Sequence, residues 1–280
     1  MDQTLKLIKL AIEEDIGSGD ITSESIVPEE HMSSGRVIAK ESGILAGIEI
    51  FEMVFKYIDK DVKIEKIKTD GDRINSGDKI IDFQGRTDSI LRAERTALNF
   101  LGHMSGIATE TSRFVEKLKG TRTKILDTRK TKPGMRLIEK LAVKLGGGTN
   151  HRTGLFDMIL IKENHISSVD SIEIAVEKAI RYRNKENMDV KIEVETQNLE
   201  EVKTVLKYPV DFIMLDNFNL SETKKAVELA AGKVKLESSG NVNLGNVRDI
   251  AETGVDYISV GAITHSAKSF DFSLLLSNKD

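Results

Sequence analysis

After residue 120, short apolar runs alternate with segments of helical periodicity. The apolar runs fall at 124–126, 158–161, 190–194, 212–215, 234–236 and 257–260. Between them, helical spacing covers 135–145, 171–183, 199–206, 221–231 and 244–252. Repeated strand–helix units of this kind predict a parallel sheet. Because the stretch is well short of the about 250 residues of a complete eight-unit barrel, we expect a small or incomplete α/β barrel, with an open doubly wound sheet as the alternative.

The first hundred residues have a different pattern. A helical segment opens the chain, a helix is expected through 51–58, and strand-like runs lie near 35–40, 62–67 and 79–83. Strands grouped apart from helices predict an α+β layer. From 88 to 119 the spacing is helical again, and we expect a break near Gly102 or Gly106 because glycine weakens a helix interior.

These patterns predict an α/β protein of two domains. Residues 1–105 form an N-terminal α+β domain, and residues 106–265 form an α/β-barrel catalytic domain. The tail 266–280 is apolar enough to dock, and we expect it to return to the first domain.

Composition narrows the class of protein. The chain has a formal net charge of -4 and no cysteine, which excludes disulfides, thiolate catalysis and cysteine-ligated zinc. An acidic balance argues against a protein that coats nucleic acid. The sequence has neither the apolar core of a signal peptide nor a run near the roughly 20 apolar residues of a membrane span. We therefore expect a cytoplasmic protein with no nucleic-acid or membrane partner.

Polar residues follow every predicted strand of the second domain. In parallel α/β architectures the functional face lies at the carboxyl ends of the strands. The residues in these places are Asp127, Thr128, Arg129 and Lys130; Lys162, Glu163, Asn164 and His165; Glu195; Asp216 and Asn217; Ser238, Ser239, Gly240 and Asn241; and Gly261. Six such endings in register predict a site at this face.

Cations dominate the first part of this face. Arg129, Lys130 and Lys162 follow strands, and His151 and Arg152 lie in the loop before the second strand. Guanidinium groups fork two donors onto a carboxylate or phosphate, and lysine adds a compact charge. So many cations on one face predict an anionic ligand.

Acidic and glycine-containing strand ends complete the pattern. Glu195 and Asp216 are hard oxygen ligands suited to Mg²⁺ shared with substrate phosphates, although both could instead cap helices. Glu193 alternates with Glu195 and would face the same way, but Glu195 lies nearer the strand end and is favoured. The segments Ser239–Asn241 and Gly261–Ala262 can expose backbone N–H groups to a phosphate. The implied ligand is phosphorylated, needs a metal and carries carboxylates.

Several motifs together resemble a known family. LRAERTALNFLGHMSGIAT, LDTRKTKPGMR, GGGTNHRTGLFDMILIKENH, IEVET, FIMLDNF, LESSGN and ETGVDYISVGAITHS occur in this order over nearly the whole chain. They resemble the quinolinate phosphoribosyltransferases. The resemblance implies a sandwich-like N-terminal α+β domain followed by an incomplete parallel α/β barrel. It implies transfer of a phosphoribosyl group from 5-phosphoribosyl 1-pyrophosphate (PRPP) to quinolinate with decarboxylation, giving nicotinate mononucleotide, pyrophosphate and CO₂ in de novo NAD biosynthesis, with Mg²⁺.

The resemblance also implies roles for single residues. Arg129, His151 and Arg152 match quinolinate-binding cations, and Arg95 would reach in from the partner subunit of a homodimer with shared active sites, with a higher oligomer left open. Lys130 and Lys162 match lysines near quinolinate and pyrophosphate, and Glu195 and Asp216 match acidic residues around ribose and metal. The remaining substrate-binding matches are Thr128, Ser239, Gly240, Asn241, Val260, Gly261 and Ala262. Thr149 and Asn241 depart from residues the family often carries, but neither change removes a charge.

Three other functions compete with this interpretation. A paralogue of the same fold from molybdenum-transport operons would act on another anionic substrate, and the intact NHR and KENH segments argue against it. A Schiff-base aldolase would use Lys162 as nucleophile. A non-catalytic anion-binding module would not need so complete a set of site residues.

Overall fold

The computed structural model describes residues 2–278. Met1, Lys279 and Asp280 lie outside the described residues, and so do the corresponding ends of the predicted ranges 1–105 and 266–280.

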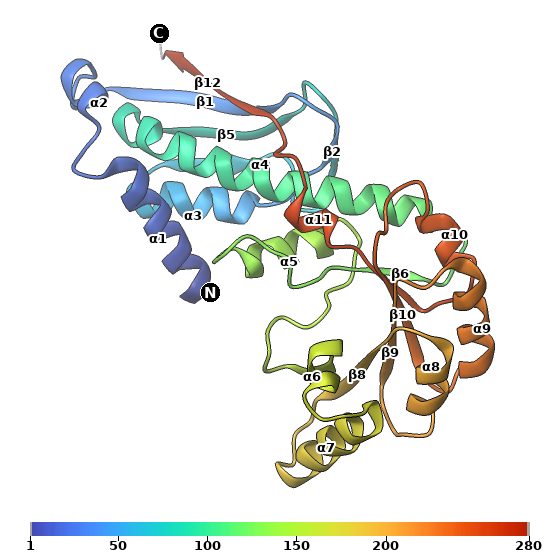
Figure 1. Cartoon of the computed structure of the whole chain (residues 1–280). Helices are drawn as coiled ribbons and strands as arrows, with labels where there is room; N and C mark the ends of the chain where they lie inside the picture. The colour runs from blue at the N-terminus through green and yellow to red at the C-terminus, as the bar shows by residue number, and fades with distance from the viewer. Residues whose placement is uncertain (1, 279–280) are drawn as a thin grey trace. The chain divides into compact units, whose positions relative to one another are not determined.

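The chain consists of two compact units. Figure 1 labels their helices and strands. Unit 1 comprises Met1–Ser112, Thr131–Gly147 and Thr264–Asp280, and unit 2 comprises Arg113–Lys130 and Gly148–Ile263. Unit 1 differs from the predicted N-terminal domain 1–105, because it also includes residues 131–147, which the prediction had assigned to the barrel domain. The predicted domain boundaries remain predictions.

Unit 1 contains an antiparallel sheet of four strands in the order β12-β1-β5-β3. Its strands are β1 (Met32–Ala39), β3 (Lys63–Lys66), β5 (Lys79–Arg86) and β12 (Phe272–Asn278), and a small second sheet pairs β2 (Gly43–Ile44) with β4 (Arg73–Ile74). The helices are α1 (Asp2–Ile16), α2 (Ile21–Ile26), α3 (Ile48–Ile58), α5 (Arg136–Leu145) and most of α4 (Thr87–Lys117). Phe55 of α3 packs on Phe83 of β5 with ring centroids 5.8 Å apart, which places an apolar helix face against the sheet.

The C-terminal strand returns to the first part of the chain. β12 pairs antiparallel with β1 from Ala39↔Phe272 to Ser33↔Asn278. The tail therefore completes one edge of the unit 1 sheet.

Helix α4 runs without interruption from Thr87 to Lys117, so the expected break near Gly102 or Gly106 is wrong. Both glycines serve close packing instead. A Cβ on Gly102 would lie 2.6 Å from the carbonyl oxygen of Phe270, and one on Gly106 would collide with that of Lys268. Glycine is required here because the backbone of the C-terminal segment passes directly over the helix.

Unit 2 is built on a six-stranded parallel sheet. Its order is β6-β11-β10-β9-β8-β7. The strands are β6 (Lys124–Leu126), β7 (Met158–Ile161), β8 (Lys191–Thr196), β9 (Phe212–Asp216), β10 (Lys235–Ser239) and β11 (Tyr257–Ser259). The helices are α6 (Glu163–Ser167), α7 (Ile172–Lys185), α8 (Leu199–Val205), α9 (Leu220–Ala230) and α10 (Val247–Ala251), and the residues of α11 (Ala262–His265) are divided between the two units.

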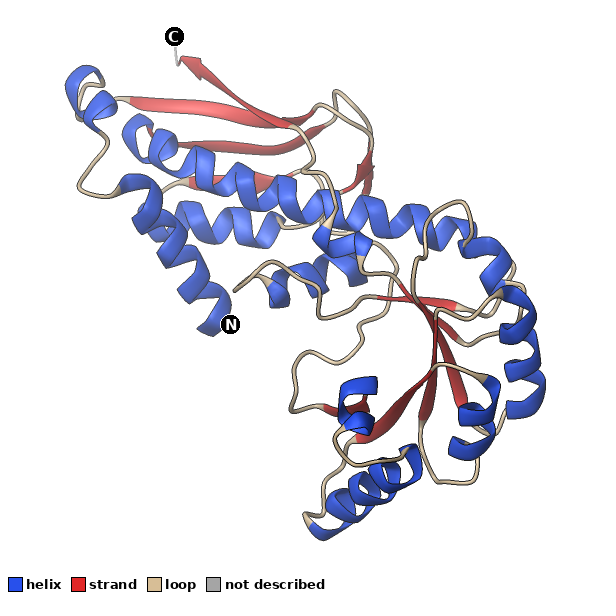
Figure 2. Cartoon of the chain, in the orientation of Figure 1, coloured by secondary structure: helices blue, strands red, loops and turns tan. Residues whose placement is uncertain are grey.

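This strand order is that of a barrel with one seam open. Consecutive strands are neighbours from β7 to β11, and the last strand pairs with the first, β6. A doubly wound sheet would instead reverse direction at a switch point. Figure 2 shows these strands together with helices flanking them. The prediction of an incomplete parallel α/β barrel is confirmed, and the doubly wound alternative is wrong.

Asparagine N-caps begin two of the barrel helices a few residues after the preceding strands. Asn198 accepts the backbone N–H of Glu201 at the start of α8, and Asn219 accepts that of Glu222 at the start of α9. Such caps satisfy N–H groups that have no partner within the helix. Among the described residues, no helix is long and apolar enough to cross a bilayer.

Candidate active site

The loop that carries His151 is attached to the end of β6. Thr149 forms a parallel bridge with Leu126, and the carboxylate of Asp127 accepts the backbone N–H of His151 at 2.8 Å. Asp127 is fully buried. A buried carboxylate with a backbone donor fixes the start of the loop, so Asp127, which the sequence places at the end of the first strand, has a structural role beside the site.

The ends of β7, β8 and β9 bring together Lys162, Glu195 and Asp216. The Lys162 ammonium donates to Oε2 of Glu195 at 3.0 Å. Burial, and then the negative charge of Glu195, hold the pKa of Asp216 above its usual value. Because the charge of Glu195 opposes the ionisation of Asp216, added positive charge is favourable at this edge of the barrel.

A hydrogen-bonded chain continues from β9 to β10. Asn217 donates through Nδ2 to Asp216 at 3.0 Å, and Asn241 donates through Nδ2 to Oδ1 of Asn217 at 3.1 Å. Gly240 has φ +103, and a Cβ there would collide with the Asn217 amide. Only glycine fits this turn, because its positive φ and the close Asn217 side chain leave no room for a Cβ. The backbone after Ser239 therefore passes close to Asn217, the neighbour of Asp216.

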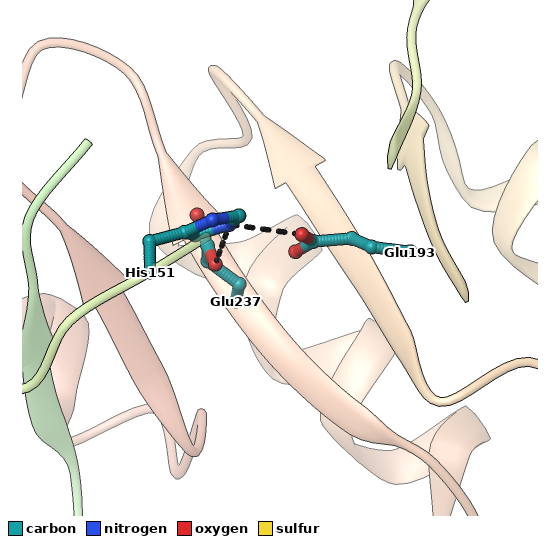
Figure 3. Close-up of side chains that lie close together, drawn as sticks. All are labelled: His151, Glu193 and Glu237. Carbon is teal, nitrogen blue, oxygen red and sulfur yellow. Dashed lines mark ion pairs between the residues drawn. The ribbon is translucent and has the colours of Figure 1, made fainter. Parts of the chain in front are cut away.

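His151 lies inside the barrel between two glutamates (Figure 3). Its Nε2 is 2.9 Å from Glu193 Oε2 and 3.3 Å from Glu237 Oε2. Burial lowers the pKa of His151, but the hydrogen bonds to Glu193 and Glu237 outweigh it and raise the pKa to about 10. Burial, and then Glu237, raise the pKa of Glu193. The raised pKa values of His151 and Glu193 mean that both groups lose their protons only at higher pH than usual.

Two guanidinium groups lie in the same part of unit 2. Burial, and then the charge of Arg129, lower the pKa of Arg152, while Glu193 acts in the opposite direction. Arg152 is 8% exposed and donates through a guanidinium N–H to the carbonyl of Met158 at 3.1 Å. A buried arginine that a second arginine repels is suited to bind an anion, which would relieve the repulsion.

The remaining predicted residues are placed as follows. Lys130 is exposed, and its backbone N–H donates to Thr128 Oγ1 at 3.0 Å. Ser239 pairs in register with Asp216, and the N–H of Val260 donates to the carbonyl of Leu126 at 2.9 Å. Gly261 and Ala262 follow Val260 and are half-buried. Arg95 is exposed on α4 in unit 1.

Sequence reasoning left out Glu193 and Glu237. Glu193 was expected to share a face with Glu195, but Glu195 was favoured. The sequence did contain one indication of Glu237. It is a single acidic residue within an apolar strand, and a buried acidic residue is unusual without a partner. The partner, His151, is distant in sequence from both glutamates, so the pattern along one strand could not identify it.

Three other histidines, His103, His165 and His265, have structural contacts. His103 Nε2 lies 2.9 Å from the buried carboxylate of Glu139 in unit 1. His165 Nδ1 accepts the backbone N–H of Lys162 at 2.9 Å and helps to begin α6. His265 Nδ1 is 2.6 Å from Ser266 Oγ. None of these contacts indicates a catalytic role for the three histidines.

Two groups offer ligands for a metal ion. Glu195 and Asp216 present hard carboxylate oxygens at strand ends, and the mutual opposition of their charges fits a divalent cation. The atoms of His151, Glu193 and Glu237 lie within 4.8 Å of one another. The hydrogen bonds to the two glutamates keep a proton on Nε2 of His151, the atom a metal would need. The first group therefore offers the better set of oxygen ligands for a divalent cation.

The fold and the site together define an α/β-barrel enzyme with a cationic site for an anionic substrate. Comparison with known proteins supports this class. The family model "Quinolinate phosphoribosyl transferase, N-terminal domain" matches residues 20–105, and the model of the C-terminal domain matches residues 107–275. The chain belongs to the quinolinate phosphoribosyltransferase family, as the sequence motifs predicted.

Named relatives cover almost the whole chain. A mitochondrial decarboxylating quinolinate phosphoribosyltransferase (2b) of Nicotiana tabacum is 42% identical over 98% of this chain and 82% of the relative. A probable carboxylating nicotinate-nucleotide pyrophosphorylase of Bacillus subtilis is 40% identical over 99% of this chain and 95% of its own length. The solved nicotinate-nucleotide pyrophosphorylase of Francisella tularensis has a TM-score of 0.94 and 42% identity, covering 99% and 96% of the two chains.

Proposed function

We propose that this chain transfers a phosphoribosyl group from PRPP to quinolinate and releases pyrophosphate and CO₂, forming nicotinate mononucleotide for NAD biosynthesis. The family and its named relatives support this activity. The observation in the structure that carries it is the Lys162–Glu195 pair beside Asp216, on the same barrel as the mutually repelling Arg129 and Arg152. A di-acid and a phosphorylated sugar need this combination of charges.

The chemistry divides between the two groups of charges. Arg129 and Arg152 bind the carboxylates of quinolinate and fix the pyridine ring. Loss of pyrophosphate leaves positive charge on the ribose, which Glu195 and Asp216 stabilise, and Lys162 offsets charge on the leaving group. Attack by the pyridine nitrogen makes a pyridinium. When the adjacent carboxylate departs as CO₂, the electron pair of the broken bond stays on the ring carbon, where the neighbouring positive nitrogen stabilises it. That carbon then takes up a proton to give nicotinate mononucleotide.

Glu195 and Asp216 would hold Mg²⁺, partly through water or substrate oxygens. When bound, the ion supplies positive charge for the pyrophosphate oxygens. The test is magnesium-dependent pyrophosphate release, with Asp216→Asn expected to raise the magnesium concentration needed for half-maximal rate. A variant with unchanged magnesium dependence would remove Asp216 from the metal site.

The test of the activity is quinolinate-dependent release of pyrophosphate. We expect Arg129→Ala and Lys162→Ala each to lose about 10²-fold or more in rate, as for removal of a group that stabilises transition-state charge. Lys178→Ala, at an exposed lysine of α7, is the matched control. Circular dichroism checks the fold of each variant. A near-normal rate in either site variant would remove that residue from the site.

A homodimer with shared active sites is part of the proposal, with Arg95 of one subunit serving the site of the other. The family resemblance and the exposure of Arg95 support it. Mixed subunits of inactive Arg95→Ala and Lys162→Ala should recover part of the activity, because some mixed sites contain neither change. No recovery in mixtures shown to exchange subunits would contradict sharing.

We also propose that the enzyme is cytoplasmic, and cell fractionation tests this location.

Two alternative functions can be compared with this proposal. The named relatives give no support to the molybdenum-operon paralogue. For the Schiff-base alternative, the Lys162 nitrogen would have to attack a carbonyl, whereas it is held 3.0 Å from Glu195. Borohydride trapping with a carbonyl substrate should therefore leave Lys162 unmodified.

A further inference from the structure

The outer edge of the unit 1 sheet is formed by β12. This strand pairs with β1 on one side and has no strand on the other among the described residues (Figure 1). Its seven residues, FSLLLSN, include no charge and no proline, and Leu275 and Leu276 are 44% and 38% exposed. Soluble proteins usually protect an edge strand with charges, proline or a bulge, because its free N–H and C=O groups can pair with another strand. The edge of β12 lacks these protections, which indicates a surface for a further strand.

The backbone groups of β12 point alternately toward β1 and away from it. The N–H of Lys40 donates to the carbonyl of Asp271 at 3.0 Å, just before the strand begins. In an antiparallel pair, the residues that exchange hydrogen bonds with the neighbouring strand alternate with residues that do not. Residues 273, 275 and 277 therefore direct their backbone groups to β1, as Asp271 does, and residues 272, 274 and 276 direct theirs outward. A further strand would bind through these outward-directed groups.

The segment is self-complementary about Leu275. In each direction along the sequence, Leu275 is followed by a leucine and then a serine. Two antiparallel copies centred on this residue place Leu275 opposite Leu275 and Leu274 opposite Leu276. Leu274 and Leu276 then exchange hydrogen bonds through their outward groups, and Leu275 occupies a non-hydrogen-bonded pair, whose side chains lie closer together. One register therefore pairs the backbone groups and brings the exposed leucines together.

The ends of the segment are complementary in charge, and the contact is small. In the sequence, Asp271 stands four places before Leu275 and Lys279 four places after it, so an antiparallel arrangement brings unlike ends together. A stable specific interface buries about 800 Å² per partner. One strand edge with two exposed leucines offers less than this. We therefore expect a weak association that increases with protein concentration.

We propose that β12 is a self-association edge, to which a second copy of this chain adds its own β12 antiparallel about a two-fold axis at Leu275. The four-stranded sheets of the two copies then form one continuous sheet. Such an isologous contact is the same in both copies, and strand addition at an open edge supplies its main-chain hydrogen bonds. The contact does not depend on the activity proposed above.

Disulfide capture tests the pairing directly. The chain has no cysteine, so an introduced cysteine reports only on its own neighbours. Two cysteines at position 275 would face each other with Cα atoms about 4.5 Å apart, within the range of a disulfide. We expect Leu275→Cys to form a disulfide-linked dimer under mild oxidation. Absence of this dimer would overturn the proposal.

Ser273→Cys is the matched control for the register. In the proposed pair, the two residues at position 273 lie four residues apart along the strands, about 14 Å, which is beyond the reach of a disulfide. We expect no linked dimer from Ser273→Cys alone, and a mixed dimer when it is combined with Ser277→Cys. Linkage of Ser273→Cys alone to the same extent as Leu275→Cys would overturn the proposal.

Sedimentation velocity tests the association without a covalent link. The wild-type protein should form larger species as its concentration rises. Leu275→Lys should weaken this association about tenfold or more, because two like charges would lie directly opposite each other. Leu229→Lys, at a leucine of α9 that is 38% exposed, should associate like the wild type. Circular dichroism checks the fold of each variant. A wild type that does not associate, or a folded Leu275→Lys that associates equally well, would overturn the proposal.

Discussion

Asp157 holds the loop that follows Arg152 by accepting backbone N–H groups. The donors are Thr153 at 2.7 Å and Gly154 at 3.0 Å. Burial raises the pKa of Asp157, but these hydrogen bonds outweigh it, and the pKa lies below its usual value. A depressed folded pKa stabilises the fold above the unfolded pKa, and the contribution is lost as pH falls through the folded pKa.

Asp157→Asn should therefore lower the free energy of unfolding by a constant amount at about pH 5–7. The difference from wild type should shrink below about pH 4, near the unfolded pKa of an aspartate. Urea unfolding of both proteins from neutral to acid pH measures this difference. A difference that stays constant well below the unfolded pKa would show that the ionised carboxylate does not hold the loop.

The sequence placed some side chains together correctly where each follows its own strand, but the roles of these residues remain predictions. Lys162, Glu195 and Asp216 follow strands and do come together in unit 2. The contacts of His151 with Glu193 and Glu237 were not predicted. His151, Glu193 and Glu237 come from three separate segments, and only the order of strands in the barrel brings them into contact.

Gly106 gives a sharp test at the scale of a helix. Gly106→Ala would improve helix propensity by about 1 kcal/mol, but its Cβ would collide with the carbonyl oxygen of Lys268. Because backbone cannot move aside as a side-chain end can, we expect a net destabilisation of about 1–3 kcal/mol. Thermal unfolding measures the change. Asn99→Ala, at an exposed position of the same helix, should be neutral or stabilising, and an equal gain at Gly106 would contradict the close approach.

Strand and helix positions in the barrel were predicted well because each element has a short, regular pattern. The run at 158–161, for example, is β7 (Met158–Ile161), and the helix expected at 221–231 is α9 (Leu220–Ala230). The break in α4 was predicted wrongly because glycine has two uses. The sequence shows a weak helix former, but the segment that packs against it lies far along the chain.

The order of strands decides the architecture of unit 2. Six strand–helix units were visible in sequence, but a barrel and a doubly wound sheet share that pattern. The pairing of β11 with β6 separates them. Likewise, a net charge of -4 for the whole molecule gave no sign of a cationic site, since a local field depends on where charges gather.

The return of the C-terminal strand to unit 1 makes a prediction at the scale of the whole chain. A chain ending at Asp271 lacks β12 and leaves β1 without its partner from Ser33 to Ala39. Each lost backbone hydrogen bond costs about 1 kcal/mol, so unit 1 should lose several kcal/mol of stability. Hydrogen exchange should become faster in β1 while β8 and β9 keep their protection, because those strands pair only within unit 2.

The control for this prediction is a chain that lacks only residues 279–280. If β1 were equally protected in both chains, the strand would not contribute to the first unit, and faster exchange in β8 would show that the two units unfold together.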